Sequence, residues 1–332
     1  MDWLVHHLAS KVPEIKDLAI QLSFVFAVSV GFVMLTRGLR RTRIRTVVRV
    51  LMSPKIWLNR SALLDYQYVA LNMLVFPLML GMVILGTNEL GSYLAGLLPP
   101  TPEHTGTLSP WAAHVLMMVA LFLALEFAYW FDHYLSHKVP LLWEFHRVHH
   151  SAEVLTPFTN FRVHPVDSLF FYNIKSIIVA LVYAGMIYAM GTGPIPMPEA
   201  TLVIVYMWLY GHLQHSQLWI AFPGWWGKIF FSPAHHQIHH SKAKIHHNTN
   251  FGMSLSIFDW AFGTLHVPTK EKQQLEFGVG PGVEHHHLAD SLIDPLVRAG
   301  RRLLGKKPGK RKAAEAVPDV APAPAMNEAS AA

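Results

Sequence analysis

Long apolar runs separated by short polar segments dominate the chain. Five of these runs approach the about 20 residues that a helix needs to cross a bilayer. They cover residues 20–35, 66–85, 111–131, 169–190 and 201–220. We therefore expect an all-α integral membrane protein with about five transmembrane helices. Residues 1–17 show neither the basic start nor the small-residue cleavage site of a signal peptide, so we expect the first helix to remain in the protein.

Lysine and arginine are distributed unevenly around these predicted helices. Residues 37–60 are rich in arginine, whereas neither residue type occurs between Arg60 and Lys138. The loop 191–198 also lacks both, and residues 298–312 are strongly basic. Because basic loops stay in the cytoplasm, we expect a multi-pass protein with its amino terminus outside and its carboxyl terminus in the cytoplasm. The Ala/Pro-rich tail favours a bacterial inner membrane over the endoplasmic reticulum.

Composition narrows the class of protein. The 332 residues are only 14% charged, against about 25% in soluble domains. The net charge of +6 comes from basic residues beside apolar runs, a pattern that favours anionic lipid over nucleic acid. The absence of cysteine excludes disulfides, cysteine zinc sites and iron–sulfur clusters. Histidine is unusually frequent, with 22 residues against 21 carboxylates.

The histidines gather in boxes at helical spacings where the predicted helices end. His133 and His137 close the third helix, a His-x-x-His-His box begins at His146, and another begins at His236. Residues three or four apart share one face of a helix, so each box directs two or three imidazoles to one point. With the pair that ends the fifth helix, the candidate metal ligands are His133, His137, His146, His149, His150, His212, His215, His236, His239 and His240.

The number of these histidines indicates more than one metal ion. Imidazole nitrogen binds iron, zinc, copper and nickel. Nine or ten imidazoles exceed the needs of one tetrahedral ion and suit two ions with about five ligands each. Of His212 and His215, we favour His215 as the ligand. Glu-x-x-His pairs, which mark carboxylate di-iron bundles, are absent from the boxes, so we expect the metals to be held almost wholly by nitrogen.

The histidine boxes also carry a family resemblance. Residues 132–137, 146–151 and 232–241, with the closing motifs Asn250-Phe-Gly and Phe258-Asp-Trp-Ala-Phe-Gly-Thr, resemble the fatty acid hydroxylase / sterol desaturase superfamily. The resemblance implies a non-haem centre of two iron ions, with O2 and two electrons as co-substrates. It also implies a lipid substrate, such as a fatty acyl chain, a polar membrane lipid or a sterol-like molecule, that is hydroxylated or desaturated at an unactivated C–H bond. His164 looks like a further family position and joins the metal set as an auxiliary member.

The resemblance covers about residues 111–267 and suggests a division of the chain. We expect a membrane region with two spans and a basic cytoplasmic loop, a catalytic domain, a cytoplasmic segment and a disordered tail, over residues 1–110, 111–267, 268–307 and 308–332. No haem-binding His-Pro-Gly-Gly motif of a cytochrome b5-like domain is present. The electrons are therefore expected from a separate protein, cytochrome b5-like or a ferredoxin. We expect the histidine-rich helices to form a cytoplasmic cap that contains the active site.

Polar residues near the boxes are candidates to orient the ligands, because a ligating imidazole needs its other nitrogen held. They are Glu126, Asp132, Glu144, Asp167, Asn250 and Asp259. Glu126 is the most informative, since it lies seven residues before His133 and therefore on the same helical face. It is also an ionisable group inside an apolar helix, which is a functional candidate by default.

Three other functions remain open at the level of the sequence. A metal-ion transporter would place its ligands near the middle of the membrane, along a pathway between repeats, whereas these histidines lie at helix ends. A haem-binding electron carrier needs two axial histidines rather than clustered triads. A zinc-dependent membrane hydrolase would use the same ligand type. The sequence leaves open which lipid is the substrate, which carbon is attacked, and whether the product is an alcohol or an alkene.

Overall fold

The computed structural model describes residues 12–37, 43–76, 85–99, 108–190, 210–280 and 287–306 of the chain. Within these ranges the protein is helical, and its only β pairing is two isolated bridges, Phe230 with Leu255 and Ser241 with Phe277. This agrees with the predicted all-α class.

Three described helices are long and apolar enough to cross a membrane: residues Leu18–Thr36 of α2 (Val12–Arg37), α8 (Pro110–Lys138) and α10 (Pro165–Met190). They correspond to the first, third and fourth predicted spans. The second and fifth predicted spans lie partly outside the described residues. Residues 66–74 of the second belong to α5 (Arg60–Leu74). The five-span count is therefore not established by these helices.

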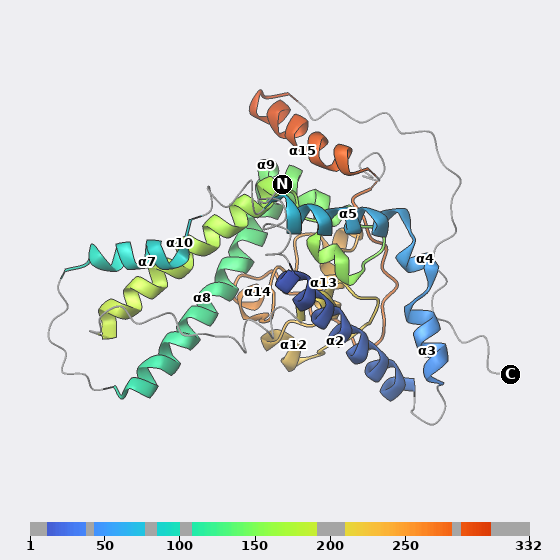
Figure 1. Cartoon of the computed structure of the whole chain (residues 1–332), viewed down its shortest axis with the longest axis horizontal. Coiled ribbons are helices and arrows are strands. Elements are labelled where there is room, and N and C mark those ends of the chain that lie inside the picture. Colours follow the sequence, from blue (N-terminus) through green and yellow to red (C-terminus); the bar gives the residue numbers. More distant parts are fainter. Residues whose placement is uncertain are drawn as a thin grey trace.

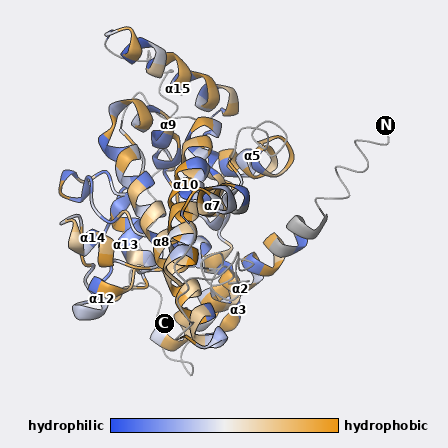
Figure 2. Cartoon of the chain, turned by 90° about the vertical axis from the view of Figure 1, so that its left-hand side faces the viewer, coloured by the Kyte–Doolittle hydropathy of each residue, from blue (hydrophilic) through white to orange (hydrophobic). Residues whose placement is uncertain are grey.

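Helices α8 and α10 pack side by side and run in opposite directions, with α9 (Pro140–His150) against the end where α8 finishes and α10 begins (Figure 1). Apolar residues run along both long helices, and polar ones are interspersed around α9 and α13 (Pro233–His239) (Figure 2). Ser109 starts α8, because its Oγ accepts a hydrogen bond from the N–H of Ala112.

The break between α8 and α9 has a local cause. Val139 precedes Pro140, and the residue before a proline avoids the helical conformation; Val139 is extended at φ −91° and ψ 112°. The missing N–H of Pro140 costs nothing at the first position of the next helix. Helix α8 therefore ends just after its two histidines, and α9 turns back so that the next box faces them.

The other described elements cover this core. They are α3 (Ile44–Leu51), α4 (Pro54–Trp57), α7 (Thr87–Gly96), η1 (Pro157–Phe161), α12 (Trp225–Ile229), η2 (Lys244–His246), α14 (Ile257–Ala261) and α15 (Leu288–Leu303). Helix α15 packs against α9 and α5, and α7 packs along α10 (Figure 1). Helix α5 packs against η1, so that the amino-terminal region meets the segment after the second histidine box.

Candidate metal centre

Nine histidines converge in two groups that could each hold a metal ion. The first group is His133, His137, His146, His150 and His239; the second is His149, His215, His236 and His240. Within each group the candidate ligand atoms all lie within 4.8 Å of one another. These nine are the histidines of the three boxes together with His215, the favoured member of its pair.

Each His-x-x-His-His box is divided between the two groups. In α9, His146 and His150 point into the first group and His149 into the second. In and just after α13 the division is reversed, since His236 and His240 belong to the second group. The i, i+4 pair of a box shares one direction and the intervening residue faces the neighbouring group. A single helix turn thus serves two sites at once.

The two groups are neighbours. The rings of His150 and His240, which belong to different groups, stack with centroids 4.4 Å apart. His149 and His150, adjacent in sequence, lie with ring centroids 5.7 Å apart. The arrangement suits a binuclear centre better than two independent sites.

Most ligand rings are held through Nδ1 by groups that accept a hydrogen bond. His133 Nδ1 lies 2.9 Å from the carbonyl oxygen of Phe251, and His239 Nδ1 lies 2.8 Å from that of Thr249. His146 Nδ1 lies 3.0 Å from a carboxylate oxygen of Asp167. Because carbonyl and carboxylate oxygens only accept, each Nδ1 carries the proton. In a neutral ring this leaves a lone pair on Nε2.

The contacts among the Nε2 atoms support a metal between them. His149 and His215 each direct Nδ1 at a backbone carbonyl oxygen, of Arg162 and Gly211, at 3.3 Å. Their Nε2 atoms then face each other at 3.1 Å as two lone pairs. In the first group the Nε2 atoms of His133 and His146 are buried without a hydrogen-bond partner among the described residues. Converging bare lone pairs are what a metal cation requires, so the residues present fit a metal.

Burial keeps these rings neutral. It lowers the pKa of His149, His150, His236 and His240 well below the usual value, and repulsion between neighbouring histidines lowers it further. Burial also lowers the pKa of His239 to about 3. A neutral imidazole is the form that binds a metal ion, so the cluster is ready to ligate at neutral pH.

Three of the predicted orienting residues act through one loop, residues 249–255, which supplies the carbonyl oxygens for His133 and His239. Glu126 Oε2 accepts from the N–H groups of Ser254 and Leu255 at 3.0 and 2.8 Å. Asp259 accepts from the N–H groups of Phe251 and Gly252 at 2.9 and 2.8 Å. Asn250, at a positive φ of 60°, bonds the carbonyl oxygens of His235 and His266 and the N–H of His266. These hydrogen bonds fix the loop at residues 250–252 and at residues 254–255.

Two other candidates lie elsewhere. Glu144 is buried, but it pairs with Arg147 at 3.0 Å and Arg302 at 2.5 Å and so ties α9 to α15 rather than to a ligand. Asp132 Oδ1 is buried without a hydrogen-bond partner in the described part of the chain. Asp167 is the candidate carboxylate that contacts a ligand directly.

His164 and His212, which the sequence analysis also placed in the metal set, lie outside the two groups. Both ring nitrogens of each are engaged. His164 Nδ1 accepts from the N–H of Val166 at 3.1 Å and Nε2 bonds the carbonyl oxygen of Leu292 at 3.0 Å. His212 Nδ1 bonds the carbonyl oxygen of Pro157 at 2.9 Å, and Nε2 bonds Gln21 Oε1 at 2.6 Å. Their hydrogen bonds join segments of the fold: that of His164 joins the start of α10 to α15, and those of His212 join residues 210–215 to η1 and α2.

A buried ion pair behind the second group was not foreseen from the sequence. Arg162 and Asp65 are both fully buried, with Nε and Oδ1 2.6 Å apart. Thr156 and Thr159 donate to Asp65 Oδ2 at 3.2 and 2.7 Å. Since the carbonyl oxygen of Arg162 holds His149, α5 supports the metal centre from outside the boxes. The only sequence feature that could have indicated this pair is the position of Asp65 directly before the apolar run 66–85.

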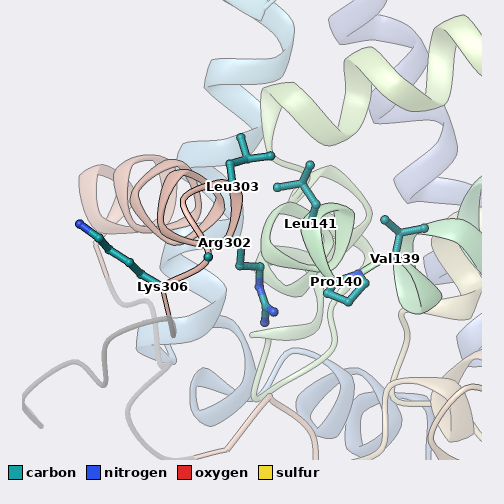
Figure 3. A pocket seen from close by; sticks show the side chains of 7 residues that line it. Val139, Pro140, Leu141, Arg302, Leu303 and Lys306 are labelled. Carbon is teal, nitrogen blue, oxygen red and sulfur yellow. The ribbon is translucent and has the colours of Figure 1, made fainter.

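A cavity of about 400 Å³ opens onto the first group. It is lined by His137, Trp143, His150, His239, His240, Ser241, Lys242, His247, Asn248, Gly278, Val279 and Gly280. A second cavity, of about 480 Å³, lies between the start of α9 and the end of α15 and is lined by Val139, Pro140, Leu141, Arg302, Leu303, Gly305 and Lys306 (Figure 3). It contains no member of either group, so of these two cavities only the first reaches the metal centre.

Replacing Glu126 by alanine is expected to weaken metal binding about 10- to 100-fold, the usual cost of losing a group that supports a ligand. The loop 249–255 would lose its acceptor for two N–H groups, and the carbonyl oxygens that hold His133 and His239 would move. Glu126→Gln keeps an acceptor oxygen and should retain most of the affinity. Metal content after dialysis against graded chelator measures both. Unchanged metal content and turnover in Glu126→Ala would contradict a supporting role.

The metal-free protein is expected to lose stability as the pH falls below about 6.5, the ordinary histidine pKa. Unfolded histidines gain protons there, whereas the buried ones with lowered pKa values stay neutral in the folded state. The unfolded state then binds more protons, so stability decreases as pH decreases, by up to about 1.4 kcal/mol per histidine and pH unit. Thermal unfolding in detergent with chelator, from pH 7.5 to 5.5, tests this. A midpoint that stays level or rises on acidification would contradict it.

Comparison with known proteins points to one family. Residues 118–264 match the profile described as fatty acid hydroxylase. Ornithine lipid hydroxylase OlsE of Rhizobium tropici is 31% identical over 205 residues, which cover 60% of this chain and 56% of that protein. Alkylglycerol monooxygenase of Xenopus tropicalis is 30% identical over 151 residues, and that of Homo sapiens 26% over 174 residues.

The alkylglycerol monooxygenase matches cover 46% and 52% of this chain and 30% and 34% of the relatives. The chain thus spans between about a third and just over half of the length of these relatives. No solved structure matches it.

Proposed function

Residues 118–264 belong to the fatty acid hydroxylase family, and from this premise we propose that the chain is a membrane-bound, histidine-ligated di-iron oxygenase that hydroxylates or desaturates a lipid. The observation that carries the proposal is the pair of adjacent histidine groups, with five and four members. Nitrogen-rich sites of this size suit two iron ions. When bound, the irons would supply the activation of O2 needed to attack an unactivated C–H bond.

The chain's own residues would hold and orient the metals. The nine histidines of the two groups would bind them through Nε2. Asp167 and the carbonyl oxygens of Thr249, Phe251 and Arg162 would keep the ring planes and tautomers fixed. Burial of the two groups would limit access of water to the reacting carbon.

The substrate we propose is a membrane lipid with a polar headgroup. The names of two kinds of relative, an ornithine lipid hydroxylase and alkylglycerol monooxygenases, both describe oxidation of polar lipids. Helix α8 supports the same choice, because it is apolar along most of its length and carries His133 and His137 in its last two turns. A lipid lying beside α8 would meet the metal centre near the polar end of the lipid.

The topology and the division into domains stand as proposals. We retain five spans, with the histidine-rich helices on the cytoplasmic face of a bacterial inner membrane. The support is the distribution of lysine and arginine in the sequence. We also retain a catalytic domain over residues 111–267 and a separate electron-transfer protein, cytochrome b5-like or a ferredoxin, as the source of electrons.

The test compares the lipids of cells with and without the protein by mass spectrometry, alongside a His149→Ala control and metal analysis of the purified protein. A lipid that gains one oxygen or loses two hydrogens only with the intact protein, together with bound iron, is the expected result. Purified protein that holds zinc and is inactive with iron and O2 would favour a hydrolase. Metal uptake into vesicles without any lipid change would favour a transporter.

A further inference from the structure

Lys175 is a cation inside one of the three helices long and apolar enough to cross a membrane, α10. Ionisable residues in such helices are costly and usually pair with a partner or mark a functional path. In the described part of the chain Lys175 forms no ion pair. Its ammonium lies over the rings of Tyr172, 4.7 Å from the centroid, and Phe171, at 5.7 Å. Within the described ranges, the contacts of the ammonium that stabilise its charge are with these aromatic faces.

The side chain of Lys175 turns toward the metal centre. Phe171 and Tyr172 precede it by four and three residues, so the ammonium lies back along α10 toward Pro165, as helical side chains tend to do. Asp167, Phe171 and Lys175 follow at intervals of four and therefore share one face of the helix. Asp167 is the residue that holds His146. Eight residues separate the two ends of this row, which is about 12 Å along the axis.

A row of aromatic contacts joins this cation to the first histidine group. The Phe171 ring packs edge-on against Tyr129 of α8, with centroids 5.8 Å apart. Tyr129 in turn packs against His133 at 5.6 Å. Tyr172, whose ring contacts that of Phe171 at 5.3 Å between centroids, is 40% exposed. The cation thus lies over one exposed ring of α10, which would face lipid, and over the first of the rings whose contacts lead to His133.

We propose that Lys175 binds the anionic group, a carboxylate or a phosphate, of the lipid that the metal centre oxidises. Lysine serves as a point charge for such groups, and an ammonium already over aromatic rings is partly desolvated. A lipid anchored there would lie along the face that Asp167, Phe171 and Lys175 share, with a C–H bond within reach of the first group. This inference rests on the proposed function, and it makes Lys175 a determinant of which lipids are accepted.

Lys228 provides a matched control. Its ammonium also lies over two rings, those of Trp225 and Trp260, at 5.6 Å from each centroid. Both rings are exposed, and their described ring contacts are with each other. Lys228 therefore has the chemistry of an interfacial lysine without a path to either histidine group. Replacing it reports on general surface charge alone.

The experiment measures binding of three lipid probes to the full chain in detergent by native mass spectrometry: oleic acid, dioleoyl phosphatidic acid and uncharged dioleoylglycerol. In Lys175→Gln, at least one of the two anionic probes is expected to bind about tenfold more weakly, the equivalent of about 1.4 kcal/mol. Dioleoylglycerol binding should not change. Lys175→Arg should retain most of the anionic binding, and Lys228→Gln should bind all three probes like the wild type. The probe that depends on Lys175 identifies the anionic group.

Three results would overturn the proposal: anionic binding in Lys175→Gln equal to the wild type, an equal loss of dioleoylglycerol, or an equal loss of anionic probes in Lys228→Gln. Binding requires neither iron nor O2, so its outcome is separate from the test of the oxygenase. Lipid oxidation in cells with unchanged probe binding in Lys175→Gln would refute only the role of Lys175. Probe binding that depends on Lys175, without any lipid oxidation, would refute only the oxygenase.

Discussion

Replacing His146 or His236 by alanine is expected to abolish lipid oxidation and to reduce bound metal from about two ions per chain to about one. His146 belongs to the first group and His236 to the second. Each variant removes one nitrogen ligand and leaves the other group complete, so one metal should remain. The double variant should bind neither ion firmly. Metal analysis of purified protein and mass spectrometry of cell lipids measure the two effects.

The matched controls are His164→Gln and His212→Gln. Both histidines lie near the centre, but their ring nitrogens are engaged by other partners. These variants should keep about two metal ions per chain, with some loss of thermal stability because each removes hydrogen bonds between segments. A loss of metal in the controls as large as in His146→Ala would refute the assignment of nine histidines as ligands and of His164 and His212 as residues that join segments. Full metal content in His236→Ala would refute the second group.

Replacing Asp65 by alanine is expected to destabilise the protein by about 3–5 kcal/mol, because it leaves the Arg162 guanidinium charged and buried without its carboxylate. Arg162 and Asp65 are both 0% exposed. Three polar partners of Arg162 remain, the Oγ and carbonyl oxygen of Ser61 and the Oγ of Ser151, but none carries a charge. The thermal unfolding midpoint in detergent measures the loss.

The same change should weaken metal binding at the second group more than at the first, because the carbonyl oxygen of Arg162 holds His149. Stepwise chelation followed by metal analysis would show one ion released earlier in Asp65→Ala than in the wild type. Asp65→Asn keeps acceptor capacity and should show both effects more weakly. Glu271→Gln, at an exposed position, is the control for loss of a carboxylate. An unfolding midpoint for Asp65→Ala equal to that of Glu271→Gln would show that the buried pair does not stabilise the fold.

Local patterns in the sequence were sufficient to single out the histidines of the boxes as candidate ligands. Helical periodicity puts the i, i+4 pair of α8 and the i, i+4 pair of each His-x-x-His-His box on a shared face, whereas the third histidine of each box faces the other group. The sequence analysis favoured His215 over His212, and the structure puts His215 alone of the two in a group. Glu126 was recognised as unusual because a carboxylate is costly in an apolar helix, although its contact with the 249–255 loop was not foreseen.

Long-range contacts account for what the sequence did not reveal. His164 was assigned to the metal set by its family position, but the carbonyl oxygen of Leu292, 128 residues away, takes one of its nitrogens. The Asp65–Arg162 pair joins residues 97 apart. Neither contact produces a periodic pattern in the sequence, because the two partners lie on different elements and meet only when those elements pack together.

The sequence by itself determined the helical class, the apolar helices α2, α8 and α10, and a set of candidate histidines that includes the nine of the two groups, since each follows from the period of a helix and the apolarity of a membrane. Only the tertiary structure decided how those histidines divide into groups of five and four, which ring nitrogens are free, and which carbonyl oxygens hold the others. The physical reason is that spacing selects a helix face, whereas the point at which several faces meet depends on packing between helices. The location of Lys175 beside the ring contacts to His133 was decided in the same way.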